Sequence, residues 1–244
     1  MTLFSEWLIG FIPFDELPLS QFWRVIIMRS FSVLVNLLII RILYRERLKY
    51  FYRIGSFKNF FLSILIISVL TFPELLNSSL TAYSASQIIE GVIFAMFIGL
   101  DEETLSRGLI FASFESKGRT LAMLISSFHF GLMHLGNYLW GGQGLSFTLG
   151  QVIESAGFGY LACALMIFSK SIWPAVLFHG LTDTPMQFQS VVRFTHEVTS
   201  SPNWLGTIVT TFTYLLMGTI LVIASDLSRH SRLTKVFQIL KLIE

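Results

Sequence analysis

Long apolar segments alternate with short polar connections along most of the chain. About 20 apolar residues are enough to cross a bilayer as a helix, so we interpret the apolar segments as membrane-spanning helices. Seven such spans are predicted, at residues 25–43, 60–72, 87–114, 119–138, 149–168, 171–184 and 205–223. The predicted fold class is therefore an all-α, polytopic membrane helical bundle of about seven transmembrane helices.

Residues 1–23 combine aromatic side chains with three acidic residues and two prolines. This composition is typical of a segment that lies at the membrane interface. A further hydrophobic element hidden in this segment would raise the number of membrane helices to eight.

Prolines and glycines predict where several of these helices end. Pro73 follows the second segment and Pro185 follows the sixth, and a proline removes one backbone hydrogen bond from a helix that continues through it. Gly118 follows the third segment and is a plausible helix terminator. We therefore expect the second and sixth helices to end just before their prolines.

Composition supports a membrane protein and excludes one class of partner. Of the 244 residues, 53% are hydrophobic and 13% are charged, whereas a soluble domain has about 25% charged residues. The formal net charge of +2 is too small to indicate a nucleic-acid partner. Cys163 is the one cysteine, which excludes an intrachain disulfide.

The distribution of basic residues predicts an orientation. The loop after the first span carries the largest group, six of the 17 Lys and Arg residues: Arg41, Arg45, Arg47, Lys49, Arg53 and Lys58. Short basic loops are retained on the cytoplasmic side, so the N-terminus is predicted outside and the C-terminus inside. Residues 229–244 are predicted to form an amphipathic helix on the cytoplasmic surface. The whole chain, residues 1–244, then forms one multi-pass domain of the cell membrane.

Four charged residues interrupt the third span, at Asp101, Glu102, Glu103 and Arg107. Charge at that depth is costly, which indicates a functional site. Glu103 and Arg107 are four residues apart and share a helix face, so we expect them to pair. Glu102 is about 100° further round the helix and should have a different role. In the first span, Arg29 and Asn36 are seven apart and are expected to face the bundle interior.

Two later spans carry titratable residues at a similar depth. His134 lies in the fourth span, and His179 and Asp183 share a face of the sixth. Glu102 and His134 are each roughly 20 Å from the turn that joins their helices, at 1.5 Å per residue. Three spans are therefore expected to bring a carboxylate, two histidines and an aspartate together.

These residue types support two kinds of hydrolytic chemistry. A carboxylate and an imidazole can deprotonate a water that attacks a carbonyl, while a second histidine with a polar partner stabilises the oxyanion. Alternatively, Glu102, His134 and His179 could hold a divalent metal such as zinc. The residues alone leave both open.

Three other titratable residues are given no catalytic role. His129 is five residues from His134 and is expected to point elsewhere. Glu90 and Glu154 lie near the outer ends of their spans and are expected to be solvated.

Three motifs resemble, in order and spacing, those of a known family. They are Glu102-Glu103-x-x-x-Arg107, Phe130-x-x-x-His134 and His179-x-x-x-Asp183. The family is that of the CAAX-protease and bacteriocin-processing (Abi) intramembrane endopeptidases, or CPBP family, and the resemblance covers about residues 88–185. It implies peptide-bond hydrolysis within the membrane, with Glu102 and His134 activating water. His179 and Asp183 would form the oxyanion site, and Glu103 and Arg107 would support it.

The resemblance further implies no catalytic metal, with zinc as the alternative, and a peptide or membrane protein as substrate. Bacteriocin maturation or self-immunity is the role it suggests. Asp183 stands where the eukaryotic prenyl-protein proteases have asparagine. An ionised aspartate cannot donate to an oxyanion, so Asp183 must be protonated, orient His179 or bind a metal.

Two other functions fit the same residues. One is a non-catalytic immunity or scaffold protein that binds a partner in the same cavity. The other is a proton-coupled transporter that uses Glu102 and His134 as a relay, although the chain has no evident internal repeat of the kind many transporters carry.

Overall fold

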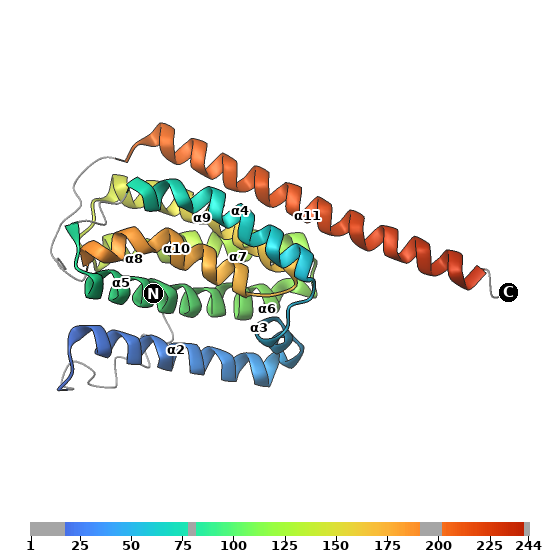
Figure 1. Cartoon of the computed structure of the whole chain (residues 1–244), viewed down its shortest axis with the longest axis horizontal. Helices are drawn as coiled ribbons and strands as arrows, with labels where there is room; N and C mark the ends of the chain where they lie inside the picture. The colour runs from blue at the N-terminus through green and yellow to red at the C-terminus, as the bar shows by residue number, and fades with distance from the viewer. Residues whose placement is uncertain (1–17, 78–81, 191–201, 242–244) are drawn as a thin grey trace.

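The computed structural model describes residues 18–77, 82–190 and 202–241, and the regular structure in these ranges is helical (Figure 1). The elements are α2 (Gln21–Leu43), η2 (Arg45–Leu48), α3 (Lys49–Tyr52), α4 (Phe57–Asn77), α5 (Ala85–Glu103), the π-helix η4 (Thr104–Ile110), α6 (Phe111–Glu115), α7 (Arg119–Met133), α8 (Gly136–Leu139), α9 (Leu145–Ser169), α10 (Trp173–Ser190) and α11 (Trp204–Lys241). The all-α prediction is confirmed for these residues. The interfacial segment predicted at 1–23 lies mostly outside them.

Among the described residues, three helices are long and apolar enough to cross a membrane by themselves: α2, α9 and the first 24 residues of α11. The bent pair Arg45–Tyr52 and Phe57–Pro73, whose axes differ by 69°, makes a fourth if it is one span. The chain is thus a helical membrane protein. The seven spans and the orientation stay predictions, because α7 has only 15 residues and α5 ends in three carboxylates.

Both helix ends predicted from prolines are wrong. The α4 helix continues through Pro73 to Asn77, and α10 continues through Pro185 to Ser190. A proline removes one hydrogen bond, and neighbouring groups in a membrane bundle commonly compensate for that loss. The predicted stop at Gly118 is correct: its φ of 126° suits glycine and ends the helical run before α7.

The fourth span was predicted to reach residue 138, but α7 ends at Met133. The His134 side chain explains this early end. Its Nδ1 lies 3.0 Å from the Phe130 carbonyl, which the backbone N–H of His134 would bond in a regular helix. That N–H bonds instead to Gly131 at 3.1 Å, in a tightened last turn. His134 is consequently a helix cap and not an interior helix residue.

The charged third span also differs from the single α-helix predicted. Helical backbone runs from Ala85 to Glu115, but the segment after Glu103 is the π-helix η4. Ser126 of α7 donates a 2.7 Å hydrogen bond to the carbonyl of Ser106 within η4. A π-helix is rare and occurs often at functional sites. Here it contains Arg107.

The C-terminal segment continues α11 with no break. Backbone from Trp204 to Lys241 forms one helix of 38 residues, which extends past the end of the bundle (Figure 1). Residues 229–241 are therefore part of α11, whereas 242–244 lie outside the described residues. The location of this segment on a membrane surface stays a prediction.

The core of the bundle is centred on α9. Its residues from Leu161 to Met166 are 0–1% exposed, because α7, α10, α11 and α4 all pack against this helix. Small residues allow these close approaches. A Cβ added at Gly131 of α7 would lie 2.6 Å from the carbonyl oxygen of Val152 on α9. Glycine at 131 therefore sets the distance between the helix that carries His134 and the central helix.

We predict that Gly131→Ala lowers the free energy of unfolding by about 1–3 kcal/mol, the usual cost of overpacking a core. The backbone oxygen that the new methyl group meets cannot move without shifting α9. Unfolding can be followed in detergent by the reaction of a fluorogenic maleimide with Cys163, which is 0% exposed in the folded protein.

Leu132→Ala is the matched control, because Leu132 is the next residue on α7 and is 40% exposed. It should unfold within a few degrees of the wild type. Equal stability of Gly131→Ala and Leu132→Ala would contradict the close packing of α7 on α9.

Candidate active site

The imidazole of His179 joins the first and third sequence motifs. Its Nδ1 lies 3.0 Å from Oε1 of Glu103 on α5. Its Nε2 lies 3.8 Å from Oε2 of Glu102 and 3.5 Å from Oδ2 of Asp183, one turn further along α10. His179 is only 5% exposed. Three carboxylates from two helices thus surround one buried ring.

Glu103 also forms the ion pair that its spacing from Arg107 predicts. Oε2 of Glu103 lies 3.0 Å from Nε of Arg107, and both side chains are 0% exposed. The Arg107 guanidinium lies over the Phe130 ring, with Cζ 4.5 Å from the ring centroid. Glu103 therefore contacts Arg107 through one oxygen and His179 through the other, which suits a structural role.

The first helix contributes charge to the same cluster. Nη1 of Arg29 on α2 lies 2.8 Å from Oδ2 of Asp101 and 3.6 Å from Oε1 of Glu102. Ser32 donates a 2.5 Å hydrogen bond to Oδ1 of Asp101. The inward face predicted for Arg29 is confirmed, but its partner Asp101 was not predicted. The charge imbalance in the sequence could have indicated this contact, because Arg107 alone cannot balance three adjacent carboxylates and a second cation is needed.

His134 reaches the same region from α7. With Nδ1 held by the Phe130 carbonyl, Nε2 is the ring nitrogen left for other partners. The Phe130 ring lies between the two histidines, with its centroid 5.3 Å from that of His134 and 5.5 Å from that of His179. Glu102 is close enough to both histidines to interact electrostatically. The second motif is thus next to the other two.

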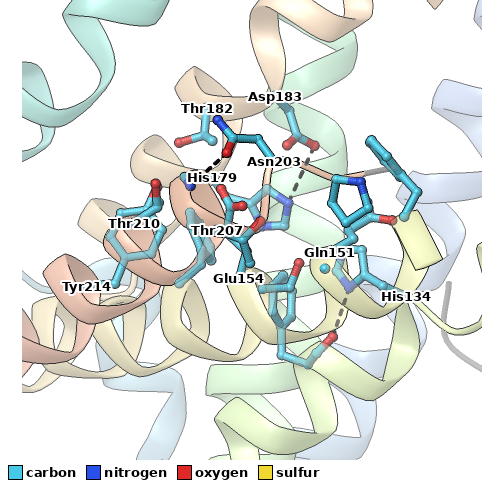
Figure 2. A pocket seen from close by; sticks show the side chains of 17 residues that line it. His134, Gln151, Glu154, His179, Thr182, Asp183, Asn203, Thr207, Thr210 and Tyr214 are labelled. Carbon is cyan, nitrogen blue, oxygen red and sulfur yellow. Dashed lines mark hydrogen bonds and ion pairs between the residues drawn. The ribbon is translucent and has the colours of Figure 1, made fainter. Parts of the chain in front are cut away.

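A cavity of about 500 Å³ opens onto these residues (Figure 2). His134, His179 and Asp183 line one side of it, and α9 and α11 supply the facing wall. The polar side chains of that wall are Gln151, Glu154, Ser155, Asn203, Thr207, Thr210 and Tyr214. Glu102 is 7% exposed and lies beside His179 without lining the cavity itself.

Glu154 is a titratable residue of the cavity wall that was given no role from the sequence. It was expected to be solvated near the outer end of its span, and it lines the cavity from α9 (Figure 2). The signal was present in the sequence, because Gln151, Glu154 and Ser155 place polar groups on one face of an otherwise apolar span. His129 does not line the cavity, as its helical offset from His134 predicted.

Within the described residues, no three His, Cys, Asp or Glu side chains are arranged to hold a metal ion. The residues considered as alternative zinc ligands, Glu102, His134 and His179, therefore do not form such a group. The expectation of no cofactor, with zinc as the alternative, stays a prediction.

We predict that Glu103→Gln destabilises the protein by about 3–5 kcal/mol, the usual cost of leaving one buried charge unpaired. Arg107 would keep its charge with no carboxylate in contact. The double variant Glu103→Gln/Arg107→Met should recover most of the loss, because it removes both charges. The reaction of Cys163 with the maleimide measures the stability of the wild type, the single variant and the double variant. A double variant less stable than Glu103→Gln would show that the pair is not the source of the effect.

Part of the chain is similar to a known protein family. Residues 84–185 match the family described as type II CAAX prenyl endopeptidase Rce1-like. No curated protein and no solved structure matches the chain. The matched range begins at the capping box of α5, where Ser84 and Gln87 exchange hydrogen bonds, and it includes all three motifs. The resemblance predicted from the motifs is therefore confirmed for residues 84–185 of the chain.

Proposed function

We propose that the protein is an intramembrane endopeptidase that hydrolyses a peptide bond of a membrane-associated peptide or protein. The observation that carries this proposal is the convergence of His134, His179 and Asp183 on one cavity beside Glu102. These residues come from three helices of the segment that matches a protease family. Such convergence of acid, base and hydrogen-bonding groups is what water-mediated hydrolysis requires.

In the proposed mechanism, Glu102 and His134 hold one water between them. Glu102 takes a proton from this water as its oxygen attacks the substrate carbonyl. The carbonyl π electrons move to oxygen and form a tetrahedral oxyanion. When the oxyanion collapses, the C–N bond breaks and the proton is returned to the leaving amine. The products are a new carboxylate and a new amine.

His179 is the proposed oxyanion donor. Its Nδ1 is held by Glu103, which leaves Nε2 towards Asp183 and the cavity. When it carries a proton, Nε2 can donate to the developing negative charge. Of the three roles considered for Asp183, orientation of this ring is the one that their 3.5 Å contact supports.

Two ion pairs that do not line the cavity hold the carboxylates of the site in place. Arg107 balances Glu103, and Arg29 balances Asp101 and contacts Glu102. The proposed substrate is a peptide or membrane protein, and bacteriocin maturation or self-immunity is the proposed role. That role rests on the family resemblance.

Glu102→Gln and His134→Ala are each expected to lower the cleavage rate by roughly 10²–10⁴-fold, the usual contribution of a general base. The assay uses purified protein in detergent with a library of hydrophobic peptides, read by mass spectrometry. Glu90→Gln and His129→Ala are matched controls, because they change the same residue types on α5 and α7 away from the cavity. Both controls should cleave at the wild-type rate.

Unchanged cleavage by Glu102→Gln and His134→Ala would contradict the assignment of the site. If folded wild type cleaves no peptide but confers bacteriocin resistance that both variants retain, the protein is an immunity or scaffold protein. The maleimide reaction of Cys163 shows in each case whether the variant is folded.

Incubation with a strong chelator should leave the cleavage rate unchanged, because the proposed mechanism uses no metal. The same peptide and detergent are used with and without the chelator. Loss of cleavage that added zinc restores would replace this mechanism with a metal-activated water at Glu102, His134 and His179.

A further inference from the structure

The two ends of the bundle differ sharply in charge. Where α2 ends, where α4 begins and at the turns after α6 and α9, the described residues carry nine basic side chains: Arg41, Arg45, Arg47, Lys49, Arg53, Lys58, Lys117, Arg119 and Lys170. We call this the basic end. In Figure 1 it is the right-hand end, near α3 and α6, beyond which α11 extends.

The opposite end is almost free of basic side chains. Here α2, α5, α9 and α11 begin, and α7 and α10 end. Among the described residues of this end, Arg24 in the first turn of α2 is the one Lys or Arg. Positively charged loops of membrane proteins are retained in the cytoplasm. This rule assigns the basic end to the cytoplasm and the opposite end to the other side of the membrane.

The cavity extends towards the end that lacks basic residues. Phe147, Gly150 and Gln151 line it from the first two turns of α9. Pro202 and Asn203 line it from just before α11, and Gly206 lines it from the first turn of that helix. All of these residues lie further from the basic end than His179 does, so the cavity runs from His179 towards the opposite end.

Packed apolar side chains separate the cavity from the basic end. The rings of Phe158 and Phe178 stack with centroids 4.4 Å apart, and Tyr214 packs edge-on against both. Beyond these rings, the core residues of α9 from Leu161 to Met166 are 0–1% exposed. A peptide cannot reach His179 from the basic end without displacing this core.

We propose that the site takes its substrate from the side of the membrane opposite the cytoplasm. The substrate class is then an exported peptide, or the segment of a membrane protein that lies on that side. That the bound molecule is a substrate rests on the proposed function. The side of the membrane to which the cavity opens does not depend on that function. A cytoplasmic C-terminal tail would meet the basic end and the closed core instead.

The side of access can be measured by cysteine labelling in whole cells. Cys163→Ala removes the native thiol from a buried site. Into this background we place Thr210→Cys, which puts a thiol of similar size on the cavity wall (Figure 2). A membrane-impermeant maleimide is applied to intact spheroplasts and to permeabilised ones. Thr210→Cys should be labelled equally in both.

Two matched positions calibrate the measurement. Ser146→Cys lies beside the cavity at the first turn of α9, and Ser116→Cys lies in the exposed turn after α6 at the basic end. Ser146→Cys should be labelled in intact spheroplasts, and Ser116→Cys only after permeabilisation. Labelling of Thr210→Cys and Ser146→Cys only after permeabilisation would overturn the proposal. Absence of Thr210→Cys labelling in both preparations would do so too, since the cavity would then be closed.

The labelling needs no catalytic activity, so its failure is distinct from failure of the proposed function. Once a cleaved peptide is known, the impermeant maleimide should also block its cleavage by Thr210→Cys in intact spheroplasts, and leave Ser116→Cys active. If Thr210→Cys is labelled as expected but the unmodified protein cleaves no peptide, the side of access is supported and the proposed protease function is wrong.

Discussion

Charged side chains buried among apolar helices cost several kcal/mol each unless opposite charges and hydrogen bonds compensate them. In this protein the carboxylates of Asp101, Glu102 and Glu103 lie side by side, and each is 7% exposed or less. Cationic partners come from two directions in the sequence, Arg29 from α2 and Arg107 from η4, while His179 of α10 contacts Glu102 and Glu103. Compensating this one acidic cluster therefore holds together the helices that form the site.

Close helix packing fixes the positions of the charged side chains in this cluster. A Cβ added at Gly99 of α5 would lie 2.9 Å from the Val176 carbonyl of α10 and 3.3 Å from Cβ of His179. A Cβ added at Gly159 of α9 would lie 3.2 Å from Nη2 of Arg107. Both glycines therefore let a neighbouring helix approach until its charged side chain reaches the cluster. The geometry of the site depends on these backbone contacts as much as on the charges.

Spacing and charge in the sequence were enough to predict the helical class, the Glu103–Arg107 pair and the convergence of the motifs at one depth. They could not predict features that depend on the helix ends. A proline has the same local cost in any sequence, but only the packed bundle shows that α4 and α10 continue through theirs. The capping role of His134 needs its ring to compete for one particular carbonyl. The polar face that Glu154 shares with Gln151 and Ser155 is visible in the sequence, but only the packing of α10 and α11 on α9 shows that this face lines the cavity.

The central claim is that Glu102 and His134 act on the same water molecule. Residues that act as a unit in catalysis show strongly non-additive losses when they are replaced together. Cleavage rates of Glu102→Gln, His134→Ala and the double variant test this claim most directly. If both residues serve one water, the double variant should cleave no more slowly than the slower single variant. If the two losses multiply in the double variant, the residues act independently and the shared-water mechanism is wrong.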